Sequence, residues 1–164
     1  MAQLTRILPV FAAFSLLTTP GLAQNASQIT QVQNEQSCPG CNLFQAELAY
    51  IDLPAVDLSG ARLRQATLAL STMNGSRFDN ANMSVANLFG GRFTGASFAG
   101  ADLSQAVLVG AHFGGANFAG ANLSGANLSG AEMATARGLT QSQLDQACGD
   151  AATQLPAELT VPVC

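Results

Sequence analysis

The sequence predicts an all-β solenoid with a short C-terminal helical cap, and three regularities predict it. Large apolar residues recur at every fifth position through nineteen repeats, small residues precede them by two positions, and glycines often follow them by two. On an α-helix this period would scatter the apolar residues around the axis, and on a strand it would alternate them between opposite faces. A chain that turns a corner every five residues keeps all of them inside.

The first 23 residues are predicted to be a signal peptide. Arg6 supplies a positive charge, Ile7 to Leu17 is an apolar run, and small residues precede a cleavage site after Ala23. This run is too short to span a bilayer, which takes about 20 apolar residues, so no stable membrane insertion is expected after cleavage. A polar N-terminal segment, 24–37, follows. The protein is therefore expected to be periplasmic or secreted.

Composition limits the classes of function. Beyond the predicted signal peptide the chain has five Arg, no Lys and ten acidic residues, a net charge of about −5. The scattered Arg residues form no basic stripe, which argues against nucleic-acid binding. All four Cys lie in the same part, and an even number of Cys in an exported chain indicates disulfides.

The repeats occupy 38–135 and contain a hint of how they are wound. The central residues, from Leu43 to Met133, are all Leu, Phe or Met, and Gly occupies ten of the nineteen positions two residues after them. Low-complexity disorder would not keep this register. If four repeats form one coil, residues twenty apart stack and fill a core of constant cross-section. The five central Phe then form two columns: Phe78, Phe98 and Phe118 in one, Phe93 and Phe113 in the other.

These repeats resemble those of the pentapeptide-repeat family, whose motif is A(D/N)LxG. Close matches are ADLSQ at 101–105, ANFAG at 116–120, and ANLSG at 121–125 and 126–130. The resemblance implies a right-handed quadrilateral parallel β-helix with four pentapeptides per coil. Cys41, Ile51 and Val56 replace the inward Ala of the motif, so the early coils are expected to be wider or less regular.

The segment 136–164 is expected to be a C-terminal cap and tail, because the last coil would otherwise expose a strand edge. Thr140 and Gln143 form a capping-box pattern, which predicts a short helix from Gln141 to about Cys148. The segment is also similar to the tails of exported bacterial members of the family, its Cys pair included. Cys148 is expected to pair with Cys164.

Cys38-Pro-Gly-Cys41 allows several interpretations. The register places both Cys at the first corner, where a Pro-Gly turn brings them within disulfide reach, and this structural disulfide is the favoured interpretation. Another pairing, a thiol redox motif and a zinc site are the alternatives. The redox interpretation lacks a thioredoxin-like βαβ pattern, and the zinc site lacks a second C-x-x-C.

No catalytic, cofactor-binding or metal site is expected. His112 is the only His, and it occupies an outward position with no Cys or Ser nucleophile beside it in register. Its column also holds Asp52, Thr72, Arg92 and Glu132. We interpret this column as a solvated ladder with modest charge pairing.

One outward feature is unusual on a polar rod. The Leu48 face is the side whose central residues are Leu48, Leu68, Leu88, Leu108 and Leu128. On its exterior lies an apolar stripe, formed by Tyr50, Leu70, Phe89, Val107 and Val109. Such a stripe indicates a contact surface. Either the chain's own tail covers it, through Leu155, Leu159, Val161 and Val163, or it binds a partner protein or a second copy.

The sequence thus predicts a non-catalytic structural or protein-interaction module. The family resemblance raises a DNA-mimicking topoisomerase binder as an alternative. Against it, the repeats hold six acidic residues offset by four Arg, and export would separate the protein from any topoisomerase. An envelope thiol–disulfide protein using Cys38 and Cys41 is the third hypothesis.

Overall fold

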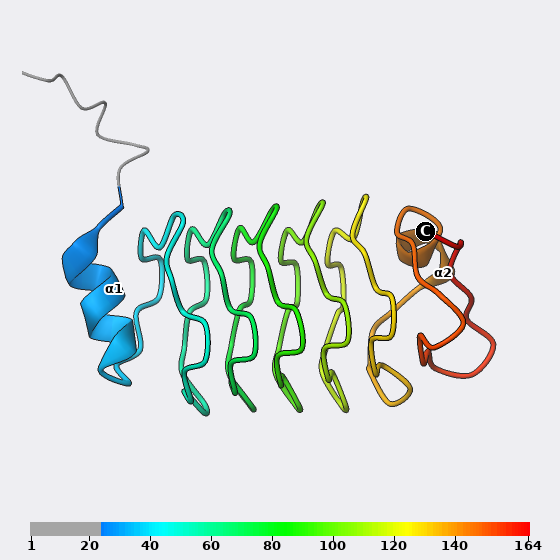
Figure 1. Cartoon of the computed structure of the whole chain (residues 1–164), viewed down its shortest axis with the longest axis horizontal. Coiled ribbons are helices and arrows are strands. Elements are labelled where there is room, and N and C mark those ends of the chain that lie inside the picture. Colours follow the sequence, from blue (N-terminus) through cyan, green and yellow to red (C-terminus); the bar gives the residue numbers. More distant parts are fainter. Residues whose placement is uncertain (1–23) are drawn as a thin grey trace, which may run out of the picture.

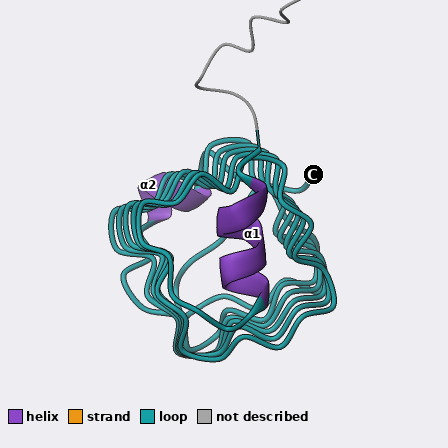
Figure 2. Cartoon of the chain, turned by 90° about the vertical axis from the view of Figure 1, so that its left-hand side faces the viewer, coloured by secondary structure: helices purple, strands orange, loops and turns teal. Residues whose placement is uncertain are grey.

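The computed structural model describes residues 24–164, a rod of stacked coils with a helix at each end (Figure 1). The predicted signal peptide lies outside these residues. Parallel β-bridges join residues twenty apart in unbroken order, from Asn42 with Arg62 to Asn117 with Arg137. Four pentapeptides therefore make one coil, and the rod is four-sided when seen from its end (Figure 2). We number the coils from the first, 41–60, to the fifth, 121–140.

Each side of a coil contributes one isolated bridge rather than a continuous strand. The chain turns a corner after every bridge, so the expected all-β character is present only as single bridged residues. The residue two positions after the centre has a positive φ in every repeat from Gln45 to Gly130. The angle is 54° at Gln45 and 66° at Gly130. Gly adopts this left-handed backbone without steric cost, which explains why it is frequent at that position.

The central residues form the interior of the rod. All nineteen are at most 2% exposed. The predicted Phe columns are present: ring centroids are 5.0 Å apart between Phe78 and Phe98, 5.1 Å between Phe98 and Phe118, and 5.5 Å between Phe93 and Phe113. Backbone amides of the central residues bond to the following coil, as from Phe98 to the Asn117 carbonyl at 2.8 Å. Packing and hydrogen bonding therefore follow the same twenty-residue repeat.

The expected irregularity of the early coils is visible at two corners, before Ile51 and before Val56, where the usual backbone hydrogen bond is absent. Most corners are closed by an amide that donates to the carbonyl three residues before it, as Ala61 does to Leu58. At Val56 the buried Ser76 hydroxyl intervenes, accepting from the Val56 amide at 3.1 Å and donating to the Leu53 carbonyl at 3.0 Å. A bulky inward Val is thus accommodated by a hydroxyl from the next coil.

Helix α1 (Ala26–Gln33) lies across the N-terminal end of the rod (Figure 2). This helix was not predicted from the sequence, in which 24–37 was expected only to be a polar segment. Its only fully buried residue is Val32, and Ile29 is half-buried against the core. The glutamines of the segment bond to the open edge of the first coil: Gln28 Oε1 accepts from the Asn42 amide at 2.7 Å, and Gln24 Nε2 donates to the Gln45 carbonyl at 2.7 Å. The segment caps the edge with side-chain amides instead of a strand.

At the other end the chain adds a partial sixth coil. Helix α2 (Gln141–Leu144) begins at the expected capping box of Thr140 and Gln143. It ends earlier than predicted, because Cys148 bridges Asn127 and must therefore be extended. The chain then continues through a bridge of Gln154 with Glu132. In the described residues neither helix is long and apolar enough to cross a membrane.

Candidate interaction surface

The structure places four members of the apolar stripe in solvent. Tyr50 is 79% exposed, Phe89 48%, Leu70 46% and Val107 38%, whereas Val109 is half-buried. They project from the first four coils of the Leu48 face, whose central Leu residues are buried beneath them. The stripe is therefore made of outward positions only, and it is additional to the core.

Two stripe residues sit in a backbone conformation that does not suit them. Tyr50 and Leu70 occupy corners with φ of 61° and 57°, where a residue with a side chain is disfavoured by roughly 1–2 kcal/mol. Their amides still bond to the next coil, at the Ala69 and Phe89 carbonyls. Leu70 has space because Gly90 follows in the next coil: a Cβ at Gly90 would lie 2.7 Å from Leu70 Cδ2. The Leu70 side chain thus leans over Gly90 of the next coil.

Val85 belongs to the same surface and was missed in the sequence analysis. It is 40% exposed and occupies the corner that precedes the Leu48 face, with φ of 59°. A β-branched residue is especially unfavourable in this conformation. The sequence does contain a signal for this residue: Val85 is apolar and β-branched, and it stands at the corner position where ten repeats have Gly. With Val85, five of the six exposed large apolar side chains in residues 24–164 lie on this face or its corners; the sixth is Val163.

The tail does not cover the stripe, so the self-docking alternative is wrong. The tail lies at the C-terminal end of the rod (Figure 1), where Leu155, Leu159 and Val161 are half-buried against the core. Val163 is 86% exposed. The exposed last coil offers both apolar side chains and unpaired backbone groups, whereas the stripe offers apolar side chains alone. Covering the end therefore satisfies more of the tail's own groups.

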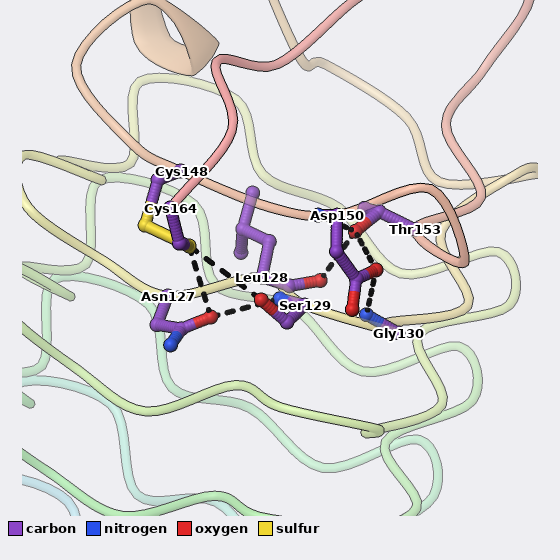
Figure 3. Close-up of a disulfide and its surroundings, with 8 residues drawn as sticks. All are labelled: Asn127, Leu128, Ser129, Gly130, Cys148, Asp150, Thr153 and Cys164. Atoms are coloured by element: carbon purple, nitrogen blue, oxygen red, sulfur yellow. Dashed lines mark hydrogen bonds between the residues drawn. A yellow bond between two sulfur atoms is a disulfide. The ribbon is translucent and has the colours of Figure 1, made fainter.

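Polar groups hold the tail at that end (Figure 3). Asp150 accepts from the Gly130 amide at 2.9 Å, and the Thr153 hydroxyl donates to the Leu128 carbonyl at 3.0 Å. The hydrogen bond from the Gly130 amide is the largest effect that lowers the pKa of Asp150 below its ordinary value. Hydrogen bonds from the Ala152 amide and from Thr153 lower it further. The carboxylate takes the place of the carbonyl that the next regular coil would supply.

The four Cys lie at the two ends of the rod. The structure brings the sulfur of Cys38 to that of Cys41, with Cα atoms 5.5 Å apart, and the sulfur of Cys148 to that of Cys164, with Cα atoms 4.8 Å apart. Cys38 and Cys41 are only 3% and 6% exposed. A reactive thiol needs access and a stabilised thiolate, and this buried pair lacks the access. Residues 24–164 contain no cluster of three or more His, Cys, Asp or Glu suited to a metal ion.

The column with His112 forms a shallow polar depression. His112 Nδ1 lies 2.8 Å from Glu132 Oε2, so the predicted stacking of these residues is present. The depression has a volume of 340 Å³, and Arg92, Thr94, Gly114 and Thr135 are among the residues that line it. Both members of the His112–Glu132 pair are largely exposed to solvent. The pair touches no Ser or Cys nucleophile in the described residues, and we assign it no chemistry.

Acidic residues on the side opposite the Leu48 face are paired. Arg77 lies 3.0 Å from Asp79 and 3.8 Å from Asp57. Partial burial would raise the pKa of Asp79, but hydrogen bonds from Ser97 and Arg77 outweigh it and lower that pKa. The pKa of Asp57 is lowered, first by the adjacent Ser59, whose amide donates to Asp57 Oδ1 at 2.9 Å, and then by Arg77. This side of the rod therefore carries compensated charge rather than an unbroken acidic surface.

Comparison with known proteins identifies the repeats. The sequence profile of the pentapeptide repeats family matches in eight copies within 38–75, 57–95, 72–105 and 96–133. Together these segments span 38–133, more than half of the chain. No curated protein sequence matches the chain.

Solved structures with the same kind of repeat include three of similar size. A pentapeptide repeat protein of the cyanobacterium Cyanothece 51142 is 24% identical over 79% of this chain and 98% of its own, with a TM-score of 0.49. One from the thylakoid lumen of Arabidopsis thaliana is 26% identical over 60% and 68% of the two chains, with a TM-score of 0.44. One from Nostoc PCC 7120 is 21% identical over 85% and 91%, with a TM-score of 0.45. These likenesses carry no information on function.

Proposed function

We propose that this chain, which belongs to the pentapeptide repeat family, is a non-catalytic protein-interaction module of the bacterial periplasm or extracellular space. The solenoid, which we infer to wind right-handed as parallel crossover connections do, acts as the scaffold. The apolar stripe, together with Val85, is the binding surface. One observation carries the proposal: five of six exposed large apolar side chains in residues 24–164 gather on one side of a polar rod.

The free-energy cost of the exposed apolar residues on the Leu48 face supports a binding role for it. A soluble protein gains nothing from exposed Tyr50 or Phe89, and corner residues such as Leu70 and Val85 add backbone strain where other repeats have Gly. Contiguous exposed apolar patches of a few hundred Å² commonly mark interaction sites. Neither the core nor the tail uses these side chains, so contact with another molecule is the function that accounts for them.

Affinity capture tests the proposed binding role. Residues 24–164 are immobilised, incubated with envelope extract of the producing bacterium, and compared with a Phe89→Ser/Val109→Ser variant. The matched control is Ala99→Ser/Ala119→Ser, which alters two outward positions on the opposite side. We expect a reproducible protein to be retained by the wild type and by the control but lost by the stripe variant. Equal retention by all three, or none by the wild type, would count against the proposal.

Export is part of the proposal and has its own test. The polar segment that begins at Gln24, the paired sulfurs at both ends and the predicted signal peptide all support a location outside the cytoplasm. We expect the mature protein to begin at Gln24 and to contain no free thiol. Mass spectrometry of the protein from fractionated cells measures both, and a full-length, reduced protein in the cytoplasm would exclude export.

The two alternative functions receive no support from a specific observation. A DNA mimic requires regularly spaced unpaired acidic groups, but Asp57 and Asp79 pair with Arg77, and Glu132 pairs with His112. A thiol oxidoreductase requires an accessible thiolate, but Cys38 and Cys41 are buried at the N-terminal end. We therefore retain the interaction module as the single proposed function.

A further inference from the structure

Exposed arginines border the Leu48 face on both sides. The side of the rod before it carries Arg62 and Arg64, and the side after it carries Arg92. Arg64 stands beside the corner column that contains Val85. Arg92 follows Phe89 by three residues, just past the next corner. The central part of the apolar stripe, in the second and third coils, therefore lies between cationic side chains.

These three arginines have no charged partner within 24–164, whereas the other two arginines of that segment are held by the chain itself. Arg77 pairs with Asp57 and Asp79 on the opposite side of the rod. Arg137 donates to the Gly115 carbonyl at 3.0 Å. The bordering arginines make neither an ion pair nor a side-chain hydrogen bond with the described residues. Their guanidinium groups are therefore available to a second molecule, next to apolar side chains that are available as well.

The carboxylates on the Leu48 face and its two neighbouring sides lie farther along the rod. They are Glu47 and Asp52 in the first coil, Asp102 in the fourth and Glu132 in the fifth. Within a column, an arginine and the nearest carboxylate are two coils apart, about 10 Å. This distance is one Debye length at an ionic strength of about 0.1 M. Asp102 and Glu132 also bond to side chains of neighbouring coils. The middle of the face is therefore locally cationic, although the chain as a whole is acidic.

A partner of this face must supply apolar contacts and negative charge together. A partner that covered the stripe with apolar groups alone would desolvate the neighbouring guanidinium groups without a counter-charge, which costs free energy. An anionic membrane surface offers both kinds of contact, but lipid recognition typically uses clusters of about four to eight basic residues. Only three arginines border this face, and the chain is acidic overall. A protein segment with carboxylates on both sides of an apolar strip therefore fits the face better.

The spacing of the coils favours a helical segment. The stripe runs along the rod from Tyr50 in the first coil to Val107 in the fourth, which is three layers or about 14 Å. An α-helix parallel to the rod presents its apolar side once per turn, about every 5.4 Å, so three turns match the three layers to within about 2 Å. An extended strand presents side chains on one face only about every 6.6 Å and would drift by about 2 Å at each layer.

We propose that the Leu48 face binds an acidic amphipathic helix of a partner protein. The helix lies along the rod, with its apolar side on the stripe and its carboxylates beside Arg64 on one flank and Arg92 on the other. The inference rests on the proposed function, because it names the chemistry of the partner that the same surface binds. The apolar contacts supply the affinity, and the arginines select for negative charge and fix the position of the helix.

Isothermal titration calorimetry of residues 24–164 with two designed helical peptides tests the proposed partner. The peptides have about 18 residues, or about five helical turns, and share one Leu-lined side. The positions that border this side are Glu in one peptide and Lys in the other. At an ionic strength of about 20 mM we expect the Glu peptide to bind at least about tenfold more tightly, since each exposed charge pair changes affinity about two- to fivefold. The preference should shrink at about 0.5 M salt.

Variants separate the bordering arginines from the overall charge of the protein. Arg64→Gln/Arg92→Gln should weaken binding of the Glu peptide about tenfold. Arg77→Gln removes a cation from the opposite side of the rod, and this control should change the affinity less than about twofold. Arg64→Glu/Arg92→Glu should reverse the preference, so that the Lys peptide binds more tightly. Circular dichroism confirms that each variant is folded.

A wild type that binds neither peptide up to about 1 mM overturns the inference, and so does equal affinity for both. A preference for the Glu peptide that survives Arg64→Glu/Arg92→Glu depends on other groups and also refutes it. Sedimentation with phosphatidylglycerol vesicles tests the membrane alternative. We expect none, and sedimentation that Arg64→Gln/Arg92→Gln abolishes would replace the partner helix with an anionic membrane surface.

These failures are distinct from failure of the proposed function. If neither peptide binds, but an envelope protein is captured by the wild type and lost from Phe89→Ser/Val109→Ser, the stripe binds a partner of different chemistry. The interaction module then stands without the acidic helix.

Discussion

Replacing Phe98 with Ala tests whether the aromatic columns stabilise the rod. Phe98 lies in the third of the five coils and is fully buried. Its ring stacks on Phe78 and Phe118, at 5.0 and 5.1 Å, and meets Phe93 and Phe113 edge-on, both at 5.7 Å. It contacts all four other central Phe, so its removal interrupts its own column at the middle and takes away the edge-on contacts to the other column.

The expected loss is about 4 kcal/mol of unfolding free energy. Removing a buried Phe side chain costs about 3–5 kcal/mol, in transfer free energy and in the cavity that remains. The four ring contacts place this residue above the lower end of that range, since each aromatic pair contributes about 0.5–1.5 kcal/mol. Because coils contact only their neighbours, the damage also separates the first two coils from the last two. The unfolding transition should therefore become broader as well as lower.

Urea denaturation followed by circular dichroism measures the effect. Phe89→Ala is the matched control, because the same side chain is 48% exposed there and contacts no other ring in the described residues. It should cost about 1 kcal/mol. If Phe98→Ala costs no more than Phe89→Ala, then the columns do not stabilise the fold and the packing argument fails.

Three further outcomes are expected. Ala55→Gly should raise stability by about 1 kcal/mol, because Ala55 has φ of 58° in a corner that Gly adopts freely; thermal melts measure it. Cys164→Ser should lower stability by about 3 kcal/mol, because Cys164 and Cys148 close a loop over a separation of sixteen residues, and limited proteolysis should then cut the tail first. Acid should destabilise the rod: the pKa values of Asp57 and Asp79 are lower folded than unfolded, so their contribution is complete above about pH 4 and is lost as pH falls through the folded values.

Each of these outcomes has a control. Ala99→Gly alters an outward position without positive φ, just before the corner at Gly100, and should destabilise rather than stabilise. For the tail, wild type under reducing conditions should behave like Cys164→Ser, and an unchanged digestion pattern would show that the disulfide does not hold the tail. For acid, Arg77→Gln should reduce the pH dependence of stability below about pH 4, since it removes the shared cation. A wild-type melt that is flat between about pH 5 and 2 would refute the linkage argument.

The sequence by itself determined the interior of this protein. A large apolar residue in each of nineteen repeats can be buried only if the chain turns a corner in each repeat, and the Phe spacing then indicates four corners per coil. The same register located Cys38 at the first corner and the capping box at Thr140, because both depend on residues close together in the chain. The apolar stripe was also readable, since outward positions follow directly from inward ones.

Only the tertiary structure decided how the ends are covered. Helix α1 has few apolar residues, so its sequence gives little amphipathic signal; its glutamines find partners, such as the Asn42 amide, only when the first coil presents an open edge. The tail packs on the end of the rod and not on the stripe, because the last coil offers backbone groups, such as the Gly130 amide, as well as apolar contacts. Helix α2 ended at Leu144 because Cys148 is needed in a bridge with Asn127. Each of these features depends on groups that become neighbours only after the coils have stacked.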